Sequence, residues 1–382
     1  MTFKLNFRDF LKVSLTSGCY WGVNGSLNLL RRLLFRDLRD PGKILIFRTG
    51  SIGDNICAIP AIVAIRTHFV QAEIHILTTA GVKSPISMAR LLSEDYYNKL
   101  IDYQGYKWLD LYHLVKRNEY HLIIELPQNM TGMVTMVRNM FFFRFAGIRS
   151  GWGWEVATLT LFKRTQERLT HFSSERNRLI SILQRNGIKS NGDLIYPLRI
   201  TADDVRCVNQ LLQERILTGL DRKHLVAIVP GAKRPQNRYP IERFVEMAKW
   251  LVRRGYYVIV IGGPDDGERG KMIESVDGAY SFVGKCTPIQ SAALLSRCRI
   301  AVSNDTGPMH LSYAVGTPVL ALFSSRDFPH KWFPPEGNRV LRNNNIHCSL
   351  CLSETCADNI CMKGISLDQV KLAFEELEQL TA

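Results

Sequence analysis

Glycine, hydroxyl and carboxylate residues occur together in the segment Arg48-Thr-Gly-Ser-Ile-Gly-Asp54, between a strand-length apolar run and a helical pattern. The two glycines permit unusual backbone angles and close approach of a ligand. Free N–H groups at a helix start suit an anion, so Ser51 and Gly53 are assigned to an anion-binding loop. A carboxylate beside an anion suggests that Asp54 is a base. The alternative is that Asp54 only caps the helix.

A second segment of the same kind is Ser303-Asn-Asp-Thr-Gly-Pro-Met-His310, which also follows a predicted strand and opens a helix. Thr306 and Gly307 offer N–H groups and a hydroxyl to a diphosphate. Asp305 would repel phosphate, so we expect it to accept hydrogen bonds from sugar hydroxyls. His310 lies one turn further on and either faces the same ligand or is a satisfied core residue.

Two more loops follow predicted strands in the second half of the chain. Lys233-Arg-Pro-Gln-Asn-Arg238 is basic, and Lys233, Arg234 and Arg238 would neutralise a leaving diphosphate, unless the loop is simply solvated. The run Ile261-Gly-Gly-Pro-Asp-Asp266 has glycines that let a flat base approach. Asp265 or Asp266 would then accept a hydrogen bond from a ribose hydroxyl.

Four of the nine cysteines fall within 14 residues, at Cys348, Cys351, Cys356 and Cys361. In a reducing compartment this spacing is typical of a structural zinc or iron site with four thiolate ligands. Reduced thiols or disulfides are the alternative. Four protein ligands leave no open position for substrate, so the role is structural in either case.

Apolar periodicity predicts two series of strands and helices around these loops. A first parallel sheet is predicted from strands at 43–49, 73–78 and 121–126. A second has strands at 225–229, 257–261, 281–283, 300–303 and 319–323, with helices at 241–254, 268–276, 288–296 and 307–315. The sequence therefore predicts an α/β fold of two Rossmann-like doubly wound domains. Their ligands should bind in a central cleft at the carboxyl ends of both sheets.

Length and charge narrow the class of protein. A chain of 382 residues exceeds what a single core usually holds. The net charge of +14 suggests a polyanionic partner: a phosphate-rich substrate, an anionic membrane face or nucleic acid. No apolar stretch reaches the roughly 18 residues of a spanning helix, and no secretory signal is evident. We therefore expect a cytoplasmic protein.

The first 40 residues differ from the rest and predict two amphipathic helices with basic polar faces, separated by a glycine-containing break. Such helices lie on an anionic membrane surface, pack on the domain behind them or form an oligomer contact. The expected organisation is a basic N-terminal segment 1–40, an N-terminal Rossmann-like domain 41–200, a C-terminal Rossmann-like domain 201–345, and a Cys-rich segment with a C-terminal helix 346–382.

Taken together, these segments resemble glycosyltransferase family 9, the bacterial ADP-heptose:lipopolysaccharide heptosyltransferases, which have the GT-B fold. The resemblance is strongest over 48–60, 229–244 and 282–323. It implies that domain 41–200 binds the acceptor and domain 201–345 the nucleotide sugar. It also implies that Asp54 is the catalytic base and that Asp305 contacts the donor sugar. Thr306 and Gly307 correspond to the diphosphate-binding pair of the family, and His310 to a histidine of the same helix. Asp265 corresponds to an acidic residue near the donor ribose. One departure is Asn237, where the family often has lysine.

The resemblance implies inverting transfer of heptose from ADP-heptose to a lipopolysaccharide-core acceptor at the inner face of the inner membrane, with no cofactor for catalysis. One alternative is a protein acceptor, because the similar autotransporter heptosyltransferases have an iron-binding cysteine cluster. Another is a catalytically silent nucleotide-sugar-binding subunit, which the loss of the lysine at position 237 would favour.

Aromatic and basic residues also gather in the first half of the chain, in the runs 141–145 and 152–154 and at Arg138, Arg144, Arg149, Arg164, Arg168 and Arg176. They would meet a phosphorylated glycolipid acceptor, or form an aromatic core with a solvated basic rim. Interleaved arginines and aromatics also occur in RNA-binding proteins. No nucleic-acid motif accompanies them here, so no nucleic-acid partner is expected.

Overall fold

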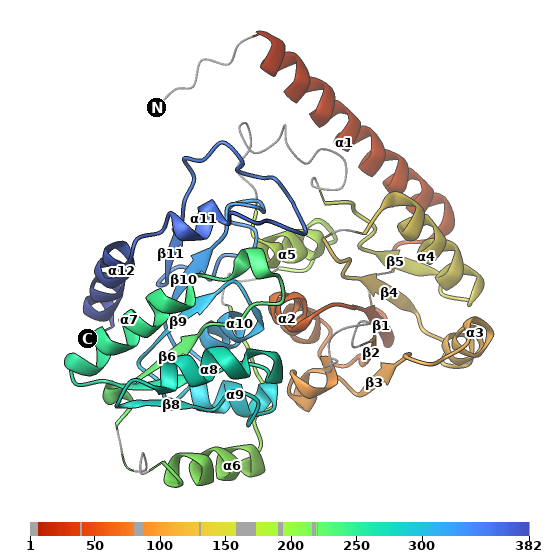
Figure 1. Ribbon diagram of the computed structural model, residues 1–382. Helices are drawn as coiled ribbons and strands as arrows, with labels where there is room; N and C mark the ends of the chain where they lie inside the picture. Colours follow the sequence, from red (N-terminus) through yellow and green to blue (C-terminus); the bar gives the residue numbers. More distant parts are fainter. Residues whose placement is uncertain are drawn as a thin grey trace. The chain divides into compact units, whose positions relative to one another are not determined.

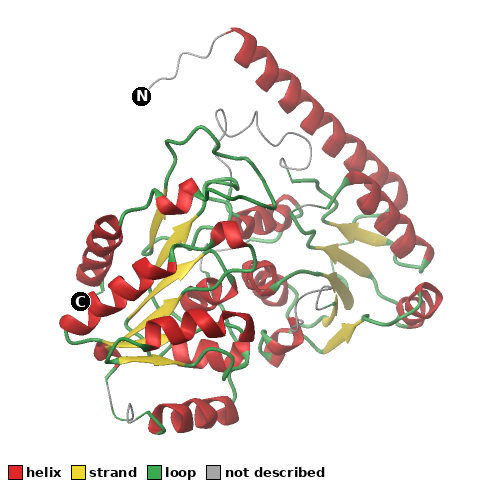
Figure 2. Ribbon diagram, in the orientation of Figure 1, coloured by secondary structure: helices red, strands yellow, loops and turns green. Residues whose placement is uncertain are grey.

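The chain forms two compact units, Met1–Ile195 and Tyr196–Ala382. The computed structural model describes residues 7–38, 40–79, 88–129, 131–157, 173–189, 194–215, 219 and 221–381. Each unit has a twisted sheet covered by helices (Figure 1, Figure 2). Arg164 and Arg168, which the sequence suggested as acceptor contacts, lie outside the described residues.

The first unit has a five-stranded sheet in the order β3-β2-β1-β4-β5, with every strand pair parallel. The strands are β1 (Lys43–Phe47), β2 (Glu73–Thr78), β3 (Lys99–Asp102), β4 (Leu122–Glu125) and β5 (Ser150–Trp152). The central strands are apolar and buried because helices cover both faces of a parallel sheet.

The helices of the first unit form two layers around that sheet (Figure 1). They are α1 (Phe7–Leu34), α2 (Ile52–His68), α3 (Trp108–Arg117), α4 (Met133–Phe145) and α5 (Glu175–Arg185), with short 3₁₀ turns at Met88–Arg90 and Glu94–Tyr96. Residues of α1, α3 and α4 share one core with β1 and β4, while α2 packs with α5. The predicted glycine break in the N-terminal segment is wrong, because α1 continues through Gly18, Gly22 and Gly25.

The second unit has a six-stranded sheet in the order β11-β10-β9-β6-β7-β8, again with all pairs parallel. Its strands are β6 (Leu225–Val229), β7 (Tyr257–Val260), β8 (Ala279–Ser281), β9 (Ile300–Asn304), β10 (Val319–Phe323) and β11 (Arg339–Arg342). Its helices are α6 (Ala202–Gln213), α7 (Ile241–Arg253), α8 (Gly267–Glu274), α9 (Pro288–Leu295), α10 (Gly307–Ala314), α11 (Ile360–Lys363) and α12 (Leu367–Leu380).

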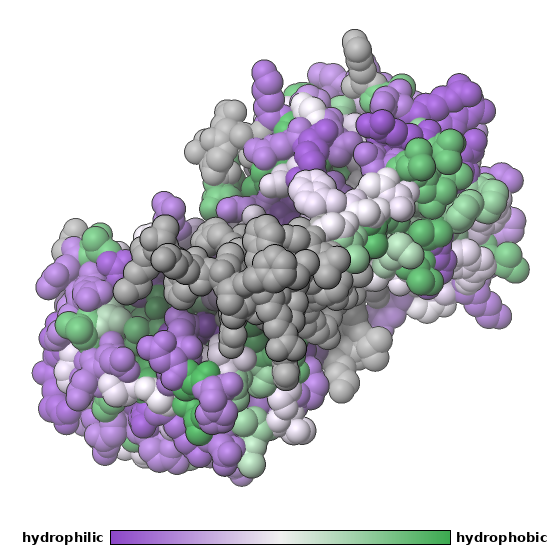
Figure 3. Space-filling model, turned by 90° about the horizontal axis from the view of Figure 1, so that it is seen from above, coloured by the Kyte–Doolittle hydropathy of each residue, from purple (hydrophilic) through white to green (hydrophobic). Residues whose placement is uncertain are grey.

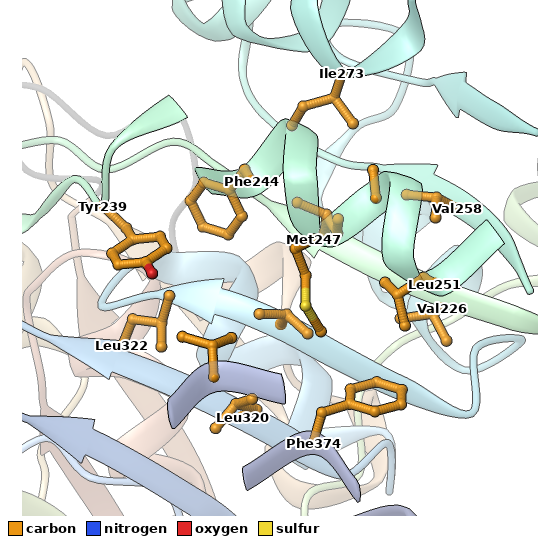
Figure 4. Packing of buried hydrophobic residues seen from close by; sticks show 14 of the residues in the cluster. Val226, Tyr239, Phe244, Met247, Leu251, Val258, Ile273, Leu320, Leu322 and Phe374 are labelled. Carbon is orange, nitrogen blue, oxygen red and sulfur yellow. The ribbon is translucent and has the colours of Figure 1, made fainter. Parts of the chain in front are cut away.

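The core of the second unit lies between its sheet and helices α7 and α12 (Figure 4). Helix α7 buries Phe244, Met247 and Leu251, a spacing that places them on one helical face. Phe374 brings α12 against the same core. This packing fixes the strands whose carboxyl ends carry the loops suggested by the sequence.

The strand orders place a topological switch point in each sheet. The winding direction reverses between β1 and β4 in the first unit and between β6 and β9 in the second. Ligands of open α/β sheets bind outside the carboxyl ends of the strands at such a point. The segments at Arg48–Asp54 and Asp305–His310, and the basic loop after β6, all lie beside these two switch points.

The predicted α/β class with parallel doubly wound sheets is confirmed. One strand was placed two residues too late, since β8 is Ala279–Ser281 rather than 281–283. The short edge strands β3, β5 and β11 were not predicted. Among the described residues, no helix is both long and apolar enough to cross a membrane.

Candidate functional site

Asp54 is held at the start of α2 by the residue that precedes the helix. The Ser51 backbone N–H donates to Asp54 Oδ2 over 2.9 Å, and the Ser51 hydroxyl donates to the same oxygen over 2.6 Å. The other oxygen, Oδ1, lies 4.0 Å from Arg48 Nη2, and the side chain is 21% exposed. Asp54 therefore does cap its helix, and its carboxylate still reaches the surface at the switch point.

The turn before Asp54 requires glycine at position 50. Gly50 has φ +149°, and a Cβ added there would lie 2.5 Å from the Asp54 Cβ. A side chain at position 50 would thus displace the carboxylate. Gly53 is buried inside the first turn of α2, while Ser51 is exposed.

Arg48 ties this turn to the end of β4 and to α5. Its guanidinium is fully buried and donates to the carbonyl oxygens of Leu126 and Pro127, each over 3.1 Å, and to that of Asp54 over 2.5 Å. It also lies 3.9 Å from the buried Glu175 carboxylate. Burial lowers the pKa of Arg48, and Asp54 and Glu175 oppose that effect. No role for Arg48 was predicted from the sequence, although an arginine at the end of an apolar strand was a usable signal.

A second carboxyl group of the first unit was also missed. Glu125 is the last residue of β4 and is 2% exposed. Burial raises the pKa of Glu125 to about 8, although Asn139 Nδ2 donates to Glu125 Oε1 over 3.0 Å. A carboxylate that ends an apolar run was the signal in the sequence. The group is protonated over much of the neutral range.

In the second unit, Asp305 follows β9 directly and has an amide as its partner. Asn237 Nδ2 donates to Asp305 Oδ2 over 3.1 Å, and the Ser324 hydroxyl donates to Asn237 Oδ1 over 2.7 Å. Burial, with a smaller contribution from Asp327, raises the pKa of Asp305 to about 7, and Arg234 and Arg326 oppose this.

The segment after Asp305 presents a helix N-terminus. Thr306 is extended and precedes α10, whose first residue is Gly307 and whose Pro308 needs no N–H partner. The backbone N–H groups there suit a phosphate. His310 is buried in the same helix, with Nδ1 2.8 Å from the Tyr313 hydroxyl and its ring against Trp332.

The basic loop after β6 and the loop after β7 meet at Gly231. A Cβ at Gly231 would lie 2.0 Å from Asp266 Oδ2, so a side chain there would displace the Asp266 carboxylate. Lys233 is exposed, whereas Arg238 Nε donates to the Ala232 carbonyl oxygen over 2.9 Å. Asp265 is exposed and lines a surface hollow of about 500 Å³, together with residues of α8. The structure thus brings the suggested donor loops to one edge of the second sheet.

The four clustered cysteines lie between β11 and α12, with Cys348, Cys351 and Cys356 on a loop and Cys361 in the short helix α11. Cys361 is buried, Cys348 and Cys351 are half-buried, and Cys356 is exposed; none of them forms a disulfide. Burial and the other three thiols raise the pKa of Cys348. Within the described part of the chain, however, no three of these side chains form a set that could hold a metal ion. As placed, the thiols do not fit a zinc or iron ion, and the metal site stays a prediction.

A chain of two doubly wound units, each with a carboxylate at its switch point, has the architecture of a GT-B glycosyltransferase. The profile of glycosyltransferase family 9 (heptosyltransferase) matches residues 108–361. This chain belongs to that family. The match includes Asp305 and the cysteines, whereas Asp54 lies before it. The family predicted from the sequence is confirmed.

Solved structures of the family confirm the GT-B fold. A glycosyltransferase family 9 protein from Veillonella parvula aligns with a TM-score of 0.68 at 19% identity, covering 91% of this chain and 99% of that one. Escherichia coli ADP-heptose lipopolysaccharide heptosyltransferase II aligns at 0.62 and 21%, covering 88% and 98%. The dodecameric iron-containing TibC from E. coli aligns at 0.54 and 13%, covering 90% and 78%.

Curated relatives are lipopolysaccharide heptosyltransferases. Heptosyltransferase 2 of Salmonella typhimurium is 34% identical over 113 residues, covering 27% of this chain and 32% of that protein. The chain therefore aligns with only about a third of the length of that relative. Lipopolysaccharide heptosyltransferase 3 of E. coli is 22% identical over a longer range, covering 76% and 85%.

Proposed function

We propose that this protein transfers heptose from ADP-heptose to a lipopolysaccharide-core acceptor with inversion at the anomeric carbon. The observation that carries the proposal is the pair of carboxylates, Asp54 and Asp305, each at the switch point of its own parallel sheet. Family membership and the names of the curated relatives support the donor and the acceptor class.

The second unit would hold the donor. Asp305 accepts hydrogen bonds from the sugar hydroxyls, and the N–H groups around Thr306 and Gly307 receive the diphosphate. Lys233 and Arg238 stabilise the charge that develops as the nucleoside diphosphate leaves. Asp265 accepts from the ribose, and His310 supports the helix from inside through Tyr313.

The first unit would supply the base. Asp54 takes the proton from the acceptor hydroxyl as that oxygen attacks the anomeric carbon. The bond from that carbon to the diphosphate oxygen breaks on the opposite face, and the electron pair leaves with ADP. The Ser51 donors and the Arg48 guanidinium keep the carboxylate oriented. The reaction as proposed uses no cofactor.

Nucleotide binding tests the donor assignment. A ligand that binds only the folded state raises the unfolding midpoint by mass action. We expect ADP and ADP-heptose to stabilise the protein selectively over UDP, GDP and CMP in a thermal-shift and calorimetry panel. Stabilisation by UDP or GDP instead would overturn the heptose donor. Binding of ADP-heptose without transfer to any acceptor would favour the silent-subunit alternative.

A protein acceptor is the second candidate, favoured by the fold similarity to TibC and by the cysteine-rich loop. Radiolabelled ADP-heptose offered with heptose-deficient lipopolysaccharide and, separately, with an unmodified autotransporter passenger domain separates the two. We expect label in the glycolipid. Label only in the protein would replace the lipopolysaccharide assignment.

We further propose that the first unit contacts the anionic inner face of the inner membrane. Figure 3 shows apolar residues gathered beside hydrophilic ones where Figure 1 places α1 and α4. Apolar side chains are exposed on α1, α3 and α4, namely Trp21, Leu29, Leu33, Trp108, Leu109, Val134, Phe141 and Phe145. Exposed Arg32 and Arg138 lie on α1 and α4, and exposed Arg36 lies two residues after the end of α1. Apolar and basic groups together bind anionic lipid.

Flotation with vesicles tests this contact. We expect binding to vesicles containing phosphatidylglycerol, weaker binding to phosphatidylcholine alone, and loss of binding when Leu29 and Leu33 are changed to serine. Leu372→Ser on α12 removes an equally exposed leucine from the second unit and serves as the control. Equal effects of both changes would contradict the assigned surface.

A further inference from the structure

Glu354 joins two arginines near the donor site of the second unit. It lies in the cysteine-rich loop, between Cys351 and Cys356. Its Oε2 is 3.3 Å from Arg234 Nε, and its Oε1 is 3.2 Å from Arg326 Nη2. Arg234 belongs to the basic loop after β6, and Arg326 follows β10. One carboxylate from a distant part of the sequence thus bridges two strand-end loops.

The cysteine-rich loop is fastened where it carries Glu354. Arg326 Nε donates to the Ser353 carbonyl oxygen over 2.9 Å, and the Leu352 N–H donates back to the Arg326 carbonyl oxygen over 3.0 Å. The Leu350 N–H donates to the Ser325 carbonyl oxygen over 2.7 Å.

The backbone of this loop is strained at the fastened positions. Leu350 and Leu352 have φ values of +59° and +52°. Bulky residues rarely adopt this left-handed conformation, and it persists only where surrounding contacts impose it. The position of Glu354 is therefore imposed by the fold, even though its side chain is 73% exposed.

Both arginines influence the carboxyl group of Asp305, the residue proposed to contact the donor sugar. Arg234 and Arg326 each oppose the rise in the pKa of Asp305. Asn237, which is hydrogen-bonded to that carboxyl, is neutral. The positive charge beside Asp305 therefore depends on where Arg234 and Arg326 point. The side chain of Arg326 is 5% exposed, whereas that of Arg234 is 45% exposed and needs an anchor.

We propose that Glu354 is a positioning residue of the donor site, which is itself anchored by the buried Arg326 and holds the guanidinium group of Arg234 in place to receive the donor diphosphate. This inference rests on the proposed function, because it assumes a nucleoside-diphosphate donor. An arginine whose side chain is not restrained loses rotamer freedom when it binds phosphate. An arginine already held by Glu354 loses less, so the donor binds more tightly.

The negative charge of Glu354 has the opposite effect to its anchoring and weakens donor binding, because a carboxylate beside the arginines reduces their attraction for phosphate. Solvent screens a side chain that is mostly exposed, so this effect is small. The restraint that Glu354 places on the arginine side chain is not weakened by this screening. We therefore expect removal of the carboxylate to weaken donor binding rather than strengthen it.

The test compares Glu354→Gln with Glu376→Gln, using calorimetric ADP affinity and steady-state kinetics with ADP-heptose. Glu376 pairs with Arg339 Nε over the same 3.3 Å at an exposed position and is the matched control. We expect about two- to tenfold weaker ADP binding and a raised donor KM for Glu354→Gln, with kcat retained. The control variant should match the wild type.

A double-mutant cycle with Arg234→Met separates positioning from a general loss of structure. If Glu354 acts through Arg234, Glu354→Gln costs less affinity in the Arg234→Met background. Tighter ADP binding by Glu354→Gln, equal losses in the control, or fully additive effects would each overturn the proposal. If the wild type prefers another nucleoside diphosphate, the donor assignment fails and the cycle is measured with that nucleotide. No binding of any nucleotide would overturn both.

Discussion

The carboxylates at the two switch points share a topology but differ in their surroundings. Asp54 receives two hydrogen bonds from Ser51 and lies 4.0 Å from the Arg48 guanidinium. Asp305 has an amide neighbour, Asn237, and burial raises its pKa to about 7. The Asp54 carboxylate lies near a buried guanidinium, whereas the hydrogen-bond partner of Asp305 is a neutral amide, and Arg234 and Arg326 only partly oppose the rise in its pKa.

This difference suits two kinds of chemistry. A carboxylate that is oriented by two hydrogen bonds and lies near an arginine is a suitable base for an acceptor hydroxyl. A carboxyl in a less polar setting makes stronger hydrogen bonds to uncharged sugar hydroxyls once it is ionised. The fold supplies the same strand-loop-helix position twice, and the neighbouring side chains decide what each position does.

The largest expected effect is on turnover by Asp54→Asn. Without a base at this position, we expect kcat to fall by about 10²- to 10⁴-fold while ADP still binds. Transfer assays and ADP calorimetry measure the two quantities on the same preparation.

The control is Asp204→Asn. Asp204 caps α6 with nearly the same bonds from Thr201, 3.0 Å from the N–H and 2.6 Å from the hydroxyl. Both variants weaken a helix cap, but only Asp54→Asn should lose turnover. If Asp54→Asn kept normal kcat, helix capping would be the whole role of Asp54.

The next effect concerns stability and is expected from Arg48→Met. Arg48 donates to three carbonyl oxygens and lies 3.9 Å from the fully buried Glu175 carboxylate, which also pairs with Arg178 over 2.8 Å. Removing the Arg48 guanidinium from this buried cluster should cost about 3 kcal/mol. Denaturant unfolding measures the loss. Arg185→Met breaks an exposed pair with Glu155 and should cost at most about 1 kcal/mol. Equal losses would mean that Arg48 is not part of a buried cluster.

A third effect is a pH dependence of stability that comes from Glu125 in the first unit. The pKa of Glu125 is raised to about 8, so the stability it contributes is fully present below its ordinary pKa. That contribution is lost as pH rises towards 8. Relative to Glu125→Gln, the wild-type free energy of unfolding should fall across this window by up to about 1.4 kcal/mol per pH unit.

Asp110→Asn, at an exposed position on α3, is the control for Glu125 and should leave the pH profile unchanged. Unfolding curves at pH 5, 6.5 and 8 measure the difference. A constant gap between wild type and Glu125→Gln would show that Glu125 is ionised throughout.

The sequence predicted the elements that carry strong local signals. The strand-glycine-helix turns at Asp54 and Asp305 were found because a buried strand, a turn and a helix start each have their own pattern. The edge strands β3, β5 and β11 were missed because three or four half-polar residues show no clear alternation. The single helix α1 was missed because glycine lowers helix propensity, while packing of α1 on α4 overrides that cost.

Partners across long sequence separations were the other part that escaped prediction. Arg48 contacts Leu126, at the end of β4, 78 residues further along the chain, and Glu175, 127 residues further along. Glu354 contacts Arg234, which lies 120 residues before it. No local pattern specifies such pairs. They follow from strand order, and so the electrostatic difference between the two carboxylates could not be read from the motifs alone.

The smallest expected effect comes from a substitution that gives Asp305 a cationic neighbour, as Asp54 has. Asn237→Lys places an ammonium group beside Asp305, and an adjacent cation lowers a carboxyl pKa by about 1–3 units. Ionised Asp305 is the form that accepts from the sugar. Wild-type affinity for ADP-heptose should therefore fall as pH drops from 8 to 6, through the raised pKa of about 7. Asn237→Lys should keep its affinity at pH 6.

Calorimetry at pH 6, 7 and 8 measures this directly, with Asn237→Ala as the variant that removes the amide without adding charge. ADP, which lacks the sugar, should bind with a weaker pH dependence than ADP-heptose in the wild type. A flat wild-type profile for ADP-heptose would contradict a titrating Asp305. A flat profile in Asn237→Ala as well as in Asn237→Lys would mean that loss of the amide, rather than gain of charge, controls the site.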